Sequence, residues 1–348
     1  MHFLVTGHTG FKGAWLSMLL ASRGHQVSGL ALEPEPGALF TRARVSEILE
    51  HDVRLDIRQA DATVREIVRI APDVVIHMAA QPLVRASYAD PRWTIETNVM
   101  GTLAVLEGVA ASPSVRAAVM VTTDKVYRNV ERIDGYVEDD ALGGRDPYSA
   151  SKAMADILVA SWTSSFSTPP TAVARAGNVI GGGDVSVDRL MPDLIRAFME
   201  GSAAELRSPD AVRPWQHVLD CLAGYLLLVD ALIVGRGRGA WNFGPDPASF
   251  RTVGETADLV AELWGEQARW VRDVSSHPHE AGLLTLDATR ARRELGWTDV
   301  LDFSAAVDWT VDWARRVHAG EDPRTVCMEQ ISRFAGLELH DQEKPHGH

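Results

Sequence analysis

Near the start of the sequence lies the stretch FLVTGHTGFKG, residues 3–13, which decides the fold. Its first three residues form a short apolar run, which is typical of a buried strand. Glycines then recur with the spacing GxxGxxG, and a helical pattern of apolar residues follows. Strand, glycine turn and helix in this order indicate a dinucleotide-binding unit, whose phosphates face the helix N-terminus. We expect the dinucleotide to contact Gly7, Thr9, Gly10, Phe11, Lys12 and Gly13.

Further apolar runs predict more strands of one parallel sheet. They cover residues 26–32, 74–77, 117–121 and 171–175, and helical patterns lie between them. Continuous apolar strands are typical of sheets that are buried on both faces. The sequence therefore predicts an α/β protein with a Rossmann-type, doubly wound parallel sheet.

The residues after the second, third and fourth strands bear on the choice of cofactor. Glu33 lies where NAD-binding units carry an acid, and no arginine directly follows to hold a 2′-phosphate, so NAD is favoured over NADP. Asp56 follows the third strand, and two readings stay open: a contact with the adenine amino group or a solvated turn. Small residues after the fourth strand let a flat cofactor lie against the backbone. The expected cofactor contacts in these segments are Asp56, Ile57, Ala79, Ala80 and Gln81.

Polar side chains follow the fifth strand, at the edge where open α/β sheets bind ligands. They are Thr123, Asp124 and Lys125. Tyr148 and Lys152 lie four residues apart on a predicted helix over 148–160, so they share one helical face. A neighbouring ammonium favours the tyrosinate, and we expect it to lower the pKa of the Tyr148 phenol. With the threonine hydroxyl, this pair makes a base that oxidises an alcohol.

Composition narrows the classes of function. The chain has 348 residues and a net charge of −13, which argues against general binding of nucleic acids or anionic membranes. No window approaches eighteen apolar residues, and we expect neither a signal peptide nor a membrane span. The two cysteines, Cys221 and Cys327, form no CxxC motif and indicate reduced thiols in a cytoplasmic protein. His277 and His279 have no further ligand cluster beside them, so we expect no metal.

Together, Thr6–Gly13, Asn98, Thr123, Tyr148 and Lys152 resemble the extended short-chain dehydrogenase/reductase superfamily. The resemblance runs from Phe3 to about Phe334. It implies a Rossmann domain and a smaller C-terminal α/β domain for a nucleotide sugar. It also places Asn98, Tyr148 and Lys152 at the cofactor, although Asn98 could equally tie the sheet together. We expect the Rossmann domain at 1–177 and 211–250, the substrate domain at 178–210 and 251–336, and a tail at 337–348.

The Thr-Asp-Lys triplet at 123–125 narrows the resemblance to one branch. Nucleotide-sugar 4,6-dehydratases usually read Thr-Asp-Glu there, and lysine in the place of Glu is similar to the CDP-glucose 4,6-dehydratases. Three further stretches point the same way: AQPLVR at 80–85, GNVIGGGD at 177–184 and RPWQHV at 213–218. The branch implies that CDP-glucose loses water to give CDP-4-keto-6-deoxyglucose through bound NAD. Asp124 would protonate the departing C6 hydroxyl, and Lys125, in its neutral form, would take the C5 proton.

The resemblance also suggests ligands for the substrate and an assembly. Relatives pair through helices equivalent to 97–111 and 148–161, so we expect a homodimer or homotetramer, although these helices could equally pack on the sheet. Two other classes stay open: a nucleotide-sugar 4-epimerase or reductase, which lacks an acid and base after the threonine, and a non-catalytic dinucleotide sensor. A dehydratase for another nucleotide sugar also stays open. The expected substrate contacts are Arg85, Asn178, Arg189, Arg207, Arg213 and His279.

Overall fold

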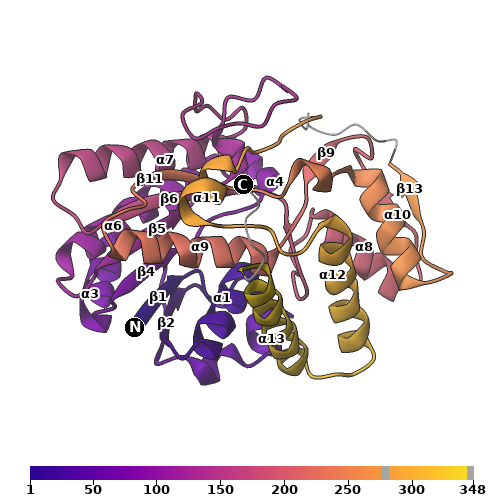
Figure 1. Cartoon of the computed structure of the whole chain (residues 1–348), viewed down its shortest axis with the longest axis horizontal. Coiled ribbons are helices and arrows are strands. Elements are labelled where there is room, and N and C mark those ends of the chain that lie inside the picture. The colour runs from indigo at the N-terminus through magenta and orange to yellow at the C-terminus, as the bar shows by residue number, and fades with distance from the viewer. Residues whose placement is uncertain (274, 276–281, 343–348) are drawn as a thin grey trace.

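A parallel sheet of seven strands forms the centre of the computed structural model, which describes residues 1–273, 275 and 282–342 (Figure 1). Every neighbouring pair in this sheet is parallel, and the chain winds outward in both directions from β1. The predicted Rossmann-type, doubly wound fold is therefore confirmed. In spatial order the strands are β11 (Gly239–Phe243), β6 (Thr171–Ala176), β5 (Ala117–Val121), β4 (Val74–His77), β1 (His2–Thr6), β2 (Gln26–Ala31) and β3 (His51–Arg54).

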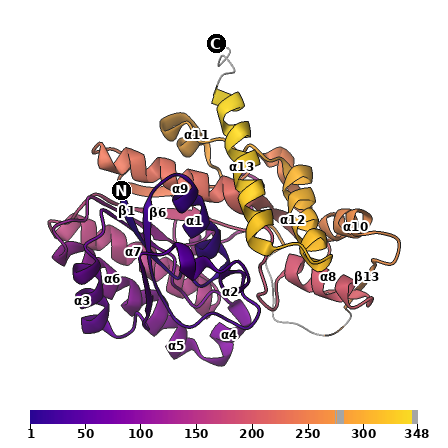
Figure 2. The same ribbon diagram turned by 90° about the horizontal axis from the view of Figure 1, so that it is seen from below.

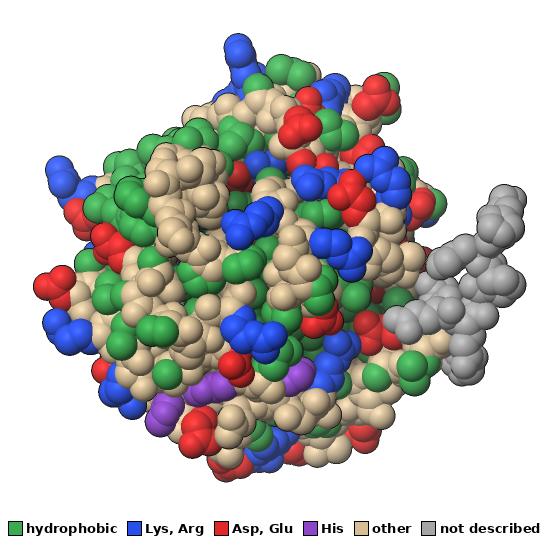
Figure 3. All heavy atoms as spheres, turned by 60° about the vertical axis from the view of Figure 1, so that its left-hand side comes forward, with side chains coloured by type: hydrophobic (Ala, Val, Ile, Leu, Met, Phe, Trp, Pro, Cys, Tyr) green, Lys and Arg blue, Asp and Glu red, His purple; other side chains and the backbone are tan. Residues whose placement is uncertain are grey.

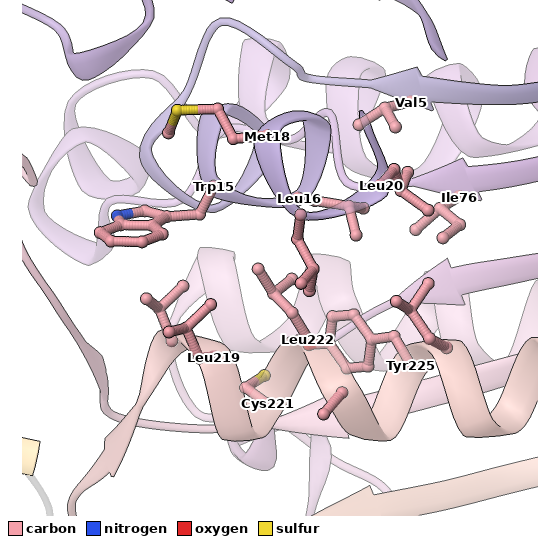
Figure 4. Packing of buried hydrophobic residues seen from close by; sticks show 14 of the residues in the cluster. Val5, Trp15, Leu16, Met18, Leu20, Ile76, Leu219, Cys221, Leu222 and Tyr225 are labelled. Carbon is pink, nitrogen blue, oxygen red and sulfur yellow. The ribbon is translucent and has the colours of Figure 1, made fainter. Parts of the chain in front are cut away.

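Alternate residues of each strand face two different helical layers, because successive side chains point to opposite faces of a sheet. Val5 and Ile76 pack with Trp15 and Leu222 on one side of the sheet. There, the helix that carries Trp15 faces the helix that carries Leu222 (Figure 4). Leu4 and its neighbours pack on the other side. The first layer contains α1 (Phe11–Ser22), α9 (Val218–Ile233) and α13 (Pro323–Gln342); the second contains α3 (Ala60–Ile70), α6 (Gly101–Ala111) and α7 (Pro147–Ser165).

A smaller lobe lies beyond the carboxyl ends of the central strands, at the right of Figure 1. Its own core joins Leu194, Val260 and Val307 from three helices. Three short strand pairs complete this lobe. The domain boundaries expected from the sequence stay a prediction. The lobe contains α8 (Leu190–Met199), α10 (Val253–Trp264) and α12 (Phe303–His318), with the pairs β7 (Val179–Ile180) and β10 (Gln216–His217), β9 (Val212–Pro214) and β12 (Phe250–Thr252), and β8 (Ala204–Leu206) and β13 (Trp270–Arg272).

Short helices connect these parts. They are α2 (Leu39–Arg42), α4 (Val84–Ala89), α5 (Pro91–Ile95) and α11 (Thr289–Leu295), together with a π-helical turn over Glu96–Met100.

Several predicted boundaries differ from the observed ones. The second strand ends at Ala31 rather than Leu32, and helix α7 runs to Ser165 instead of 160. Residues 337–342 of the expected tail at 337–348 are helical, because α13 continues through Gln342. This helix runs beside α1 (Figure 2). Phe334 anchors it in the core, and Glu338 pairs with Arg23 at 2.8 Å. Residues 343–348 lie outside the described part of the chain.

The surface carries charges of both signs. On the face shown in Figure 3, acidic, basic and apolar side chains are interspersed rather than gathered by sign. Among the described helices, none combines the length and apolar character that crossing a bilayer requires. Cys221 and Cys327 are free, buried thiols, as expected.

Candidate active site

A cavity of about 1200 Å³ opens at the carboxyl ends of the central strands. Pockets for a single small ligand are usually about 300–1,000 Å³, so this one has room for a cofactor and a second molecule. The smaller lobe closes its far side. Of the predicted site residues, the cavity wall contains Gly7, Thr9, Gly10, Phe11, Lys12, Gly13, Asp56, Ile57, Ala79, Ala80, Gln81, Arg85, Thr123, Asp124, Lys125, Tyr148, Lys152, Asn178, Arg189, Arg207 and Arg213.

The glycine turn brings backbone from three segments together. Gly7 has φ +76°, a left-handed conformation that glycine adopts without strain. A Cβ atom at position 13 would lie only 2.2 Å from the Gly7 carbonyl oxygen, so α1 approaches the turn as closely as it does because residue 13 has no side chain. The backbone N–H groups at the start of α1 border the cavity. This cradle fits a dinucleotide pyrophosphate.

At the end of the cavity beside β2 and β3, acidic and basic side chains meet in a way that the sequence analysis did not predict. Glu33 lines the cavity, and its carboxylate accepts a hydrogen bond from Arg54 Nε at 3.2 Å. Asp56 lines it too, and the adjacent Arg58 guanidinium lowers the pKa of that carboxyl. The Asp56 carboxylate also accepts from the Arg58 backbone N–H at 3.0 Å, so this residue forms a turn at the cavity edge. The sequence analysis did not predict the contact with Arg54, because Arg54 lies on β3 whereas Glu33 follows β2.

Asn98 does not line the cavity. Its side chain is 1% exposed and accepts a hydrogen bond from the Gln81 backbone N–H at 2.8 Å. Its amide donates to the Gln81 carbonyl oxygen at 3.1 Å and to Ser151 Oγ at 2.8 Å. The residue lies in the π-helical turn before α6 and ties the loop after β4 to α7. It therefore positions backbone that borders the cavity.

Thr123, Asp124, Tyr148 and Lys152 all line the cavity, and all four are buried. Thr123 Oγ1 donates to Asp124 Oδ1 at 2.8 Å, and a hydrogen bond also links Thr123 to the Tyr148 phenol. The other carboxylate oxygen, Asp124 Oδ2, is buried without a hydrogen-bond partner among the described residues. Lys125 lines the cavity beside them and is half-buried. A hydroxyl, a carboxylate, a phenol and two amines thus border the same space.

The pKa of Tyr148 departs from our expectation. Burial is the main reason that its pKa is raised to about 12, and the hydrogen bond with Thr123 offsets the effect of burial only in part. Our expectation that Lys152 lowers the pKa of the Tyr148 phenol was wrong: desolvation is the largest influence, and Thr123 and Arg189, rather than Lys152, are the groups that lower it. Burial, together with the nearby Lys12 ammonium, lowers the pKa of Lys152 to about 8. Lys152 Nζ donates to the Val121 carbonyl oxygen at 3.1 Å, at the end of β5.

Lys12 reaches away from the glycine turn toward α9. Its ammonium donates to the Tyr225 hydroxyl at 2.8 Å and lies 5.0 Å from the centre of that ring. It therefore places a second positive charge near Lys152, as the lowered pKa of Lys152 reflects. The GxxGxxG spacing alone gave no sign of this contact.

The arginines expected at the substrate meet carboxylates at the mouth of the cavity. Arg85 pairs with Asp188 at 2.9 Å, Arg207 approaches the same carboxylate at 3.5 Å, and Arg189 pairs with Asp184 at 3.1 Å. Asp188 has φ +61°, an uncommon conformation for a residue with a side chain. Asp188 was missed because Arg85 lies 103 residues away in the sequence, whereas Asp184 lies only five residues before Arg189 and could have been noticed. Of the remaining candidates, Arg213 and Asn178 line the smaller lobe's side, and His279 lies outside the described residues.

A buried ion pair lies next to the end of β5, where Thr123 and Asp124 follow the strand. Arg175 donates to both carboxylate oxygens of Asp156, at 2.8 and 2.7 Å. Thr122 Oγ1 donates to the same carboxylate at 3.2 Å, and Arg175 also donates to the Tyr127 hydroxyl at 2.8 Å. Asp156 is four residues after Lys152 on α7, so the helical spacing could have signalled it.

The comparisons with known proteins agree with this geometry. Residues 3–244 match the model of the NAD dependent epimerase/dehydratase family. The chain is similar to a CDP-glucose 4,6-dehydratase of Salmonella typhimurium, with 40% identity over 95% of each chain. It is also similar to a solved dTDP-glucose 4,6-dehydratase of Streptomyces venezuelae with NAD and TYD bound, at a TM-score of 0.77 and 26% identity over 93% of this chain and all of the other. A UDP-glucose-4-epimerase of Stenotrophomonas maltophila shares the fold, with a TM-score of 0.80 and 23% identity over 92% of this chain and all of the other.

Proposed function

Since the chain belongs to the NAD dependent epimerase/dehydratase family, we propose that it is an NAD-dependent CDP-glucose 4,6-dehydratase, a carbon–oxygen lyase. It converts CDP-glucose to CDP-4-keto-6-deoxyglucose and water. The observation that carries this proposal is that Asp124 and Lys125 border the same cavity as Thr123, Tyr148 and Lys152. The last three suffice for oxidation at C4, whereas the acid and the amine supply what loss of water requires.

The cofactor fits the cradle of the glycine turn and the wall formed by the segments after β2, β3 and β4. When bound, NAD accepts a hydride from the sugar and later returns it, so that the overall reaction has no net redox change. The chain's own residues manage the protons. In its ionised form, Tyr148 takes the proton of the C4 hydroxyl. Thr123, which already contacts both Tyr148 and Asp124, orients that hydroxyl.

Loss of water then uses the two residues after the threonine. The C4 ketone acidifies the C5 proton, which Lys125, in its neutral form or through a water that it holds, removes. Asp124 protonates the C6 hydroxyl as it departs, and its unpartnered Oδ2 is the oxygen free to carry that proton. Buried Lys152, four residues after Tyr148 on α7, would hold the ribose of the cofactor.

Charged side chains at the cavity mouth suit a nucleoside diphosphate. Guanidinium groups form paired hydrogen bonds with phosphate oxygens, and Arg85, Arg189, Arg207 and Arg213 border this part of the cavity. Asn178 would hold a diphosphate or sugar oxygen. The choice of cytidine rests on the 40% identical dehydratase of Salmonella typhimurium.

A 4-epimerase or reductase is the second candidate, because a UDP-glucose-4-epimerase shares the fold. The position of Asp124 beside Thr123 argues against it, since oxidation and reduction at C4 need no acid there. The direct test is incubation of the purified enzyme with CDP-glucose in deuterated water, followed by mass spectrometry for loss of one water and uptake of one deuterium.

The enzyme acts in the cytoplasm as a homodimer or homotetramer, which is also part of the proposal. Apolar side chains on α5, the π-helical turn and α7 support an assembly, because four of them are exposed rather than packed on the sheet. They are Ile95 at 39%, Met100 at 53%, Met154 at 38% and Ile157 at 55% exposure. Buried free thiols suit the cytoplasm.

A further inference from the structure

The carboxylate of Asp124 lies against the backbone of Gly177, the residue that follows β6. A Cβ atom at position 177 would lie 2.0 Å from Asp124 Oδ2, 2.2 Å from Cγ and 2.7 Å from Oδ1. Real Cβ atoms essentially never come closer than 3.0 Å to another heavy atom. In this geometry a side chain at 177 and the carboxylate of Asp124 therefore exclude each other.

The backbone at 177 is held from both sides, so the carboxylate is the group that would have to move. Upstream, β6 pairs with β11 as far as Ala176. Downstream, the buried Gln216 amide donates to the Gly177 carbonyl oxygen at 3.2 Å and to that of Phe243 at 2.9 Å. The Gln216 backbone N–H also donates to the Asn178 carbonyl oxygen at 3.3 Å. A methyl group at 177 would thus displace the Asp124 side chain and break its 2.8 Å bond to Thr123.

We propose that Gly177 is a positioning residue for Asp124, which makes the absence of a side chain at 177 a condition for loss of water. The inference rests on the proposed role of Asp124 as the acid for the C6 hydroxyl. Loss of water breaks the C6–O bond and the C5–H bond and forms a C5=C6 double bond. Lys125 takes the C5 proton, and the proton from Asp124 completes the departing water. Oxidation at C4 needs none of these groups. A side chain at position 177 should therefore prevent loss of water but leave oxidation at C4 unaffected.

The experiment compares Gly177→Ala with Gly336→Ala, whose added Cβ in α13 would meet nothing within 4 Å. Each purified enzyme receives CDP-glucose in deuterated water, with loss of water followed by mass spectrometry and reduced nicotinamide followed by absorbance. We expect Gly177→Ala to lose water about 100-fold or more slowly, the usual contribution of a general acid, while the rise in reduced nicotinamide stays within a few-fold of the parent. Gly336→Ala should match the parent in both. Water loss at the parental rate in Gly177→Ala, or an equal fall of both signals, would overturn the inference.

A stability cycle tests the steric contact without any substrate. Gly177→Ala should lower the Tm of the parent but leave the Tm of Asp124→Ala unchanged, because the methyl then fills the space that the carboxylate has left. An equal fall in both backgrounds would place the strain elsewhere and overturn the inference. If the parent enzyme itself releases no water from any nucleotide sugar, the proposed function fails, whereas the Tm cycle still decides whether Gly177 positions Asp124.

Discussion

At the scale of single residues, the buried Lys152 is the most unusual group in the site. Its side chain is 7% exposed, and burial together with the Lys12 charge lowers its pKa to about 8 from an ordinary 10.5. Below that pH the buried Lys152 is charged, which lowers the free energy of unfolding. This charge lies four residues after Tyr148 on α7. Buried ionisable side chains with strongly shifted pKa values are common at catalytic sites, although they lower the stability of the fold.

Replacing this charge should stabilise the protein. Below about pH 8 the folded Lys152 is charged, and the unfolded one is charged up to about pH 10.5, so the folding penalty is full below pH 8 and fades as the pH rises toward 10.5. We therefore expect Lys152→Met to gain up to about 3 kcal/mol in free energy of unfolding at neutral pH, a gain that shrinks near pH 10. Urea unfolding at both pH values measures it, with Lys125→Met, at a half-buried lysine, as the control. A gain that does not depend on pH would contradict the assigned shift.

At the scale of elements, α7 and β6 are joined by the Arg175–Asp156 ion pair, whose side chains are both 4% exposed. The Asp156 carboxylate also accepts a hydrogen bond from the Thr122 hydroxyl, next to the proposed catalytic residues at the end of β5. The junction therefore fixes the distance between α7, which carries Tyr148 and Lys152, and the strand end that carries Thr123.

Removing one partner of this pair should cost much more than removing a surface partner. Asp156→Ala leaves a buried guanidinium uncompensated, and we expect a loss of about 3–5 kcal/mol in free energy of unfolding. Asp210→Ala, which breaks the exposed pair with Arg272, should cost at most about 1 kcal/mol. Urea unfolding of the two variants distinguishes them. Equal losses would show that the α7–β6 junction does not depend on the ion pair.

Local patterns explain which features were predictable. Apolar runs and the GxxGxxG spacing predicted the central strands up to β6 and the glycine turn, although not β11. The four-residue spacing placed Tyr148 and Lys152 on one face of α7. By contrast, Gln216 reaches Gly177 across 39 residues, and Arg85 reaches Asp188 across 103. Such pairs depend on the folded chain. The raised pKa of Tyr148 was missed for the same reason, because burial is a tertiary property.

At the scale of the whole molecule, the exposed apolar residues on α5 and α7 bear on assembly. We expect Ile157→Glu to place a charge in a subunit interface and to reduce the mass of the oligomer in solution, as measured by light scattering after size-exclusion chromatography. Val234→Glu is the matched control, since Val234 follows α9 and is 64% exposed. An unchanged mass for Ile157→Glu would exclude this face as the interface.

The central claim is that this cavity removes water from CDP-glucose. The measurement that tests it most directly incubates the purified protein separately with CDP-glucose, UDP-glucose, dTDP-glucose and GDP-mannose in deuterated water. Mass spectrometry then follows loss of one water and uptake of one deuterium. We predict both changes with CDP-glucose and not with the other three. Water loss from another nucleotide sugar alone would keep the dehydratase and contradict the choice of cytidine. Isomerised sugar or accumulated reduced cofactor without water loss from any of the four would contradict the dehydratase itself.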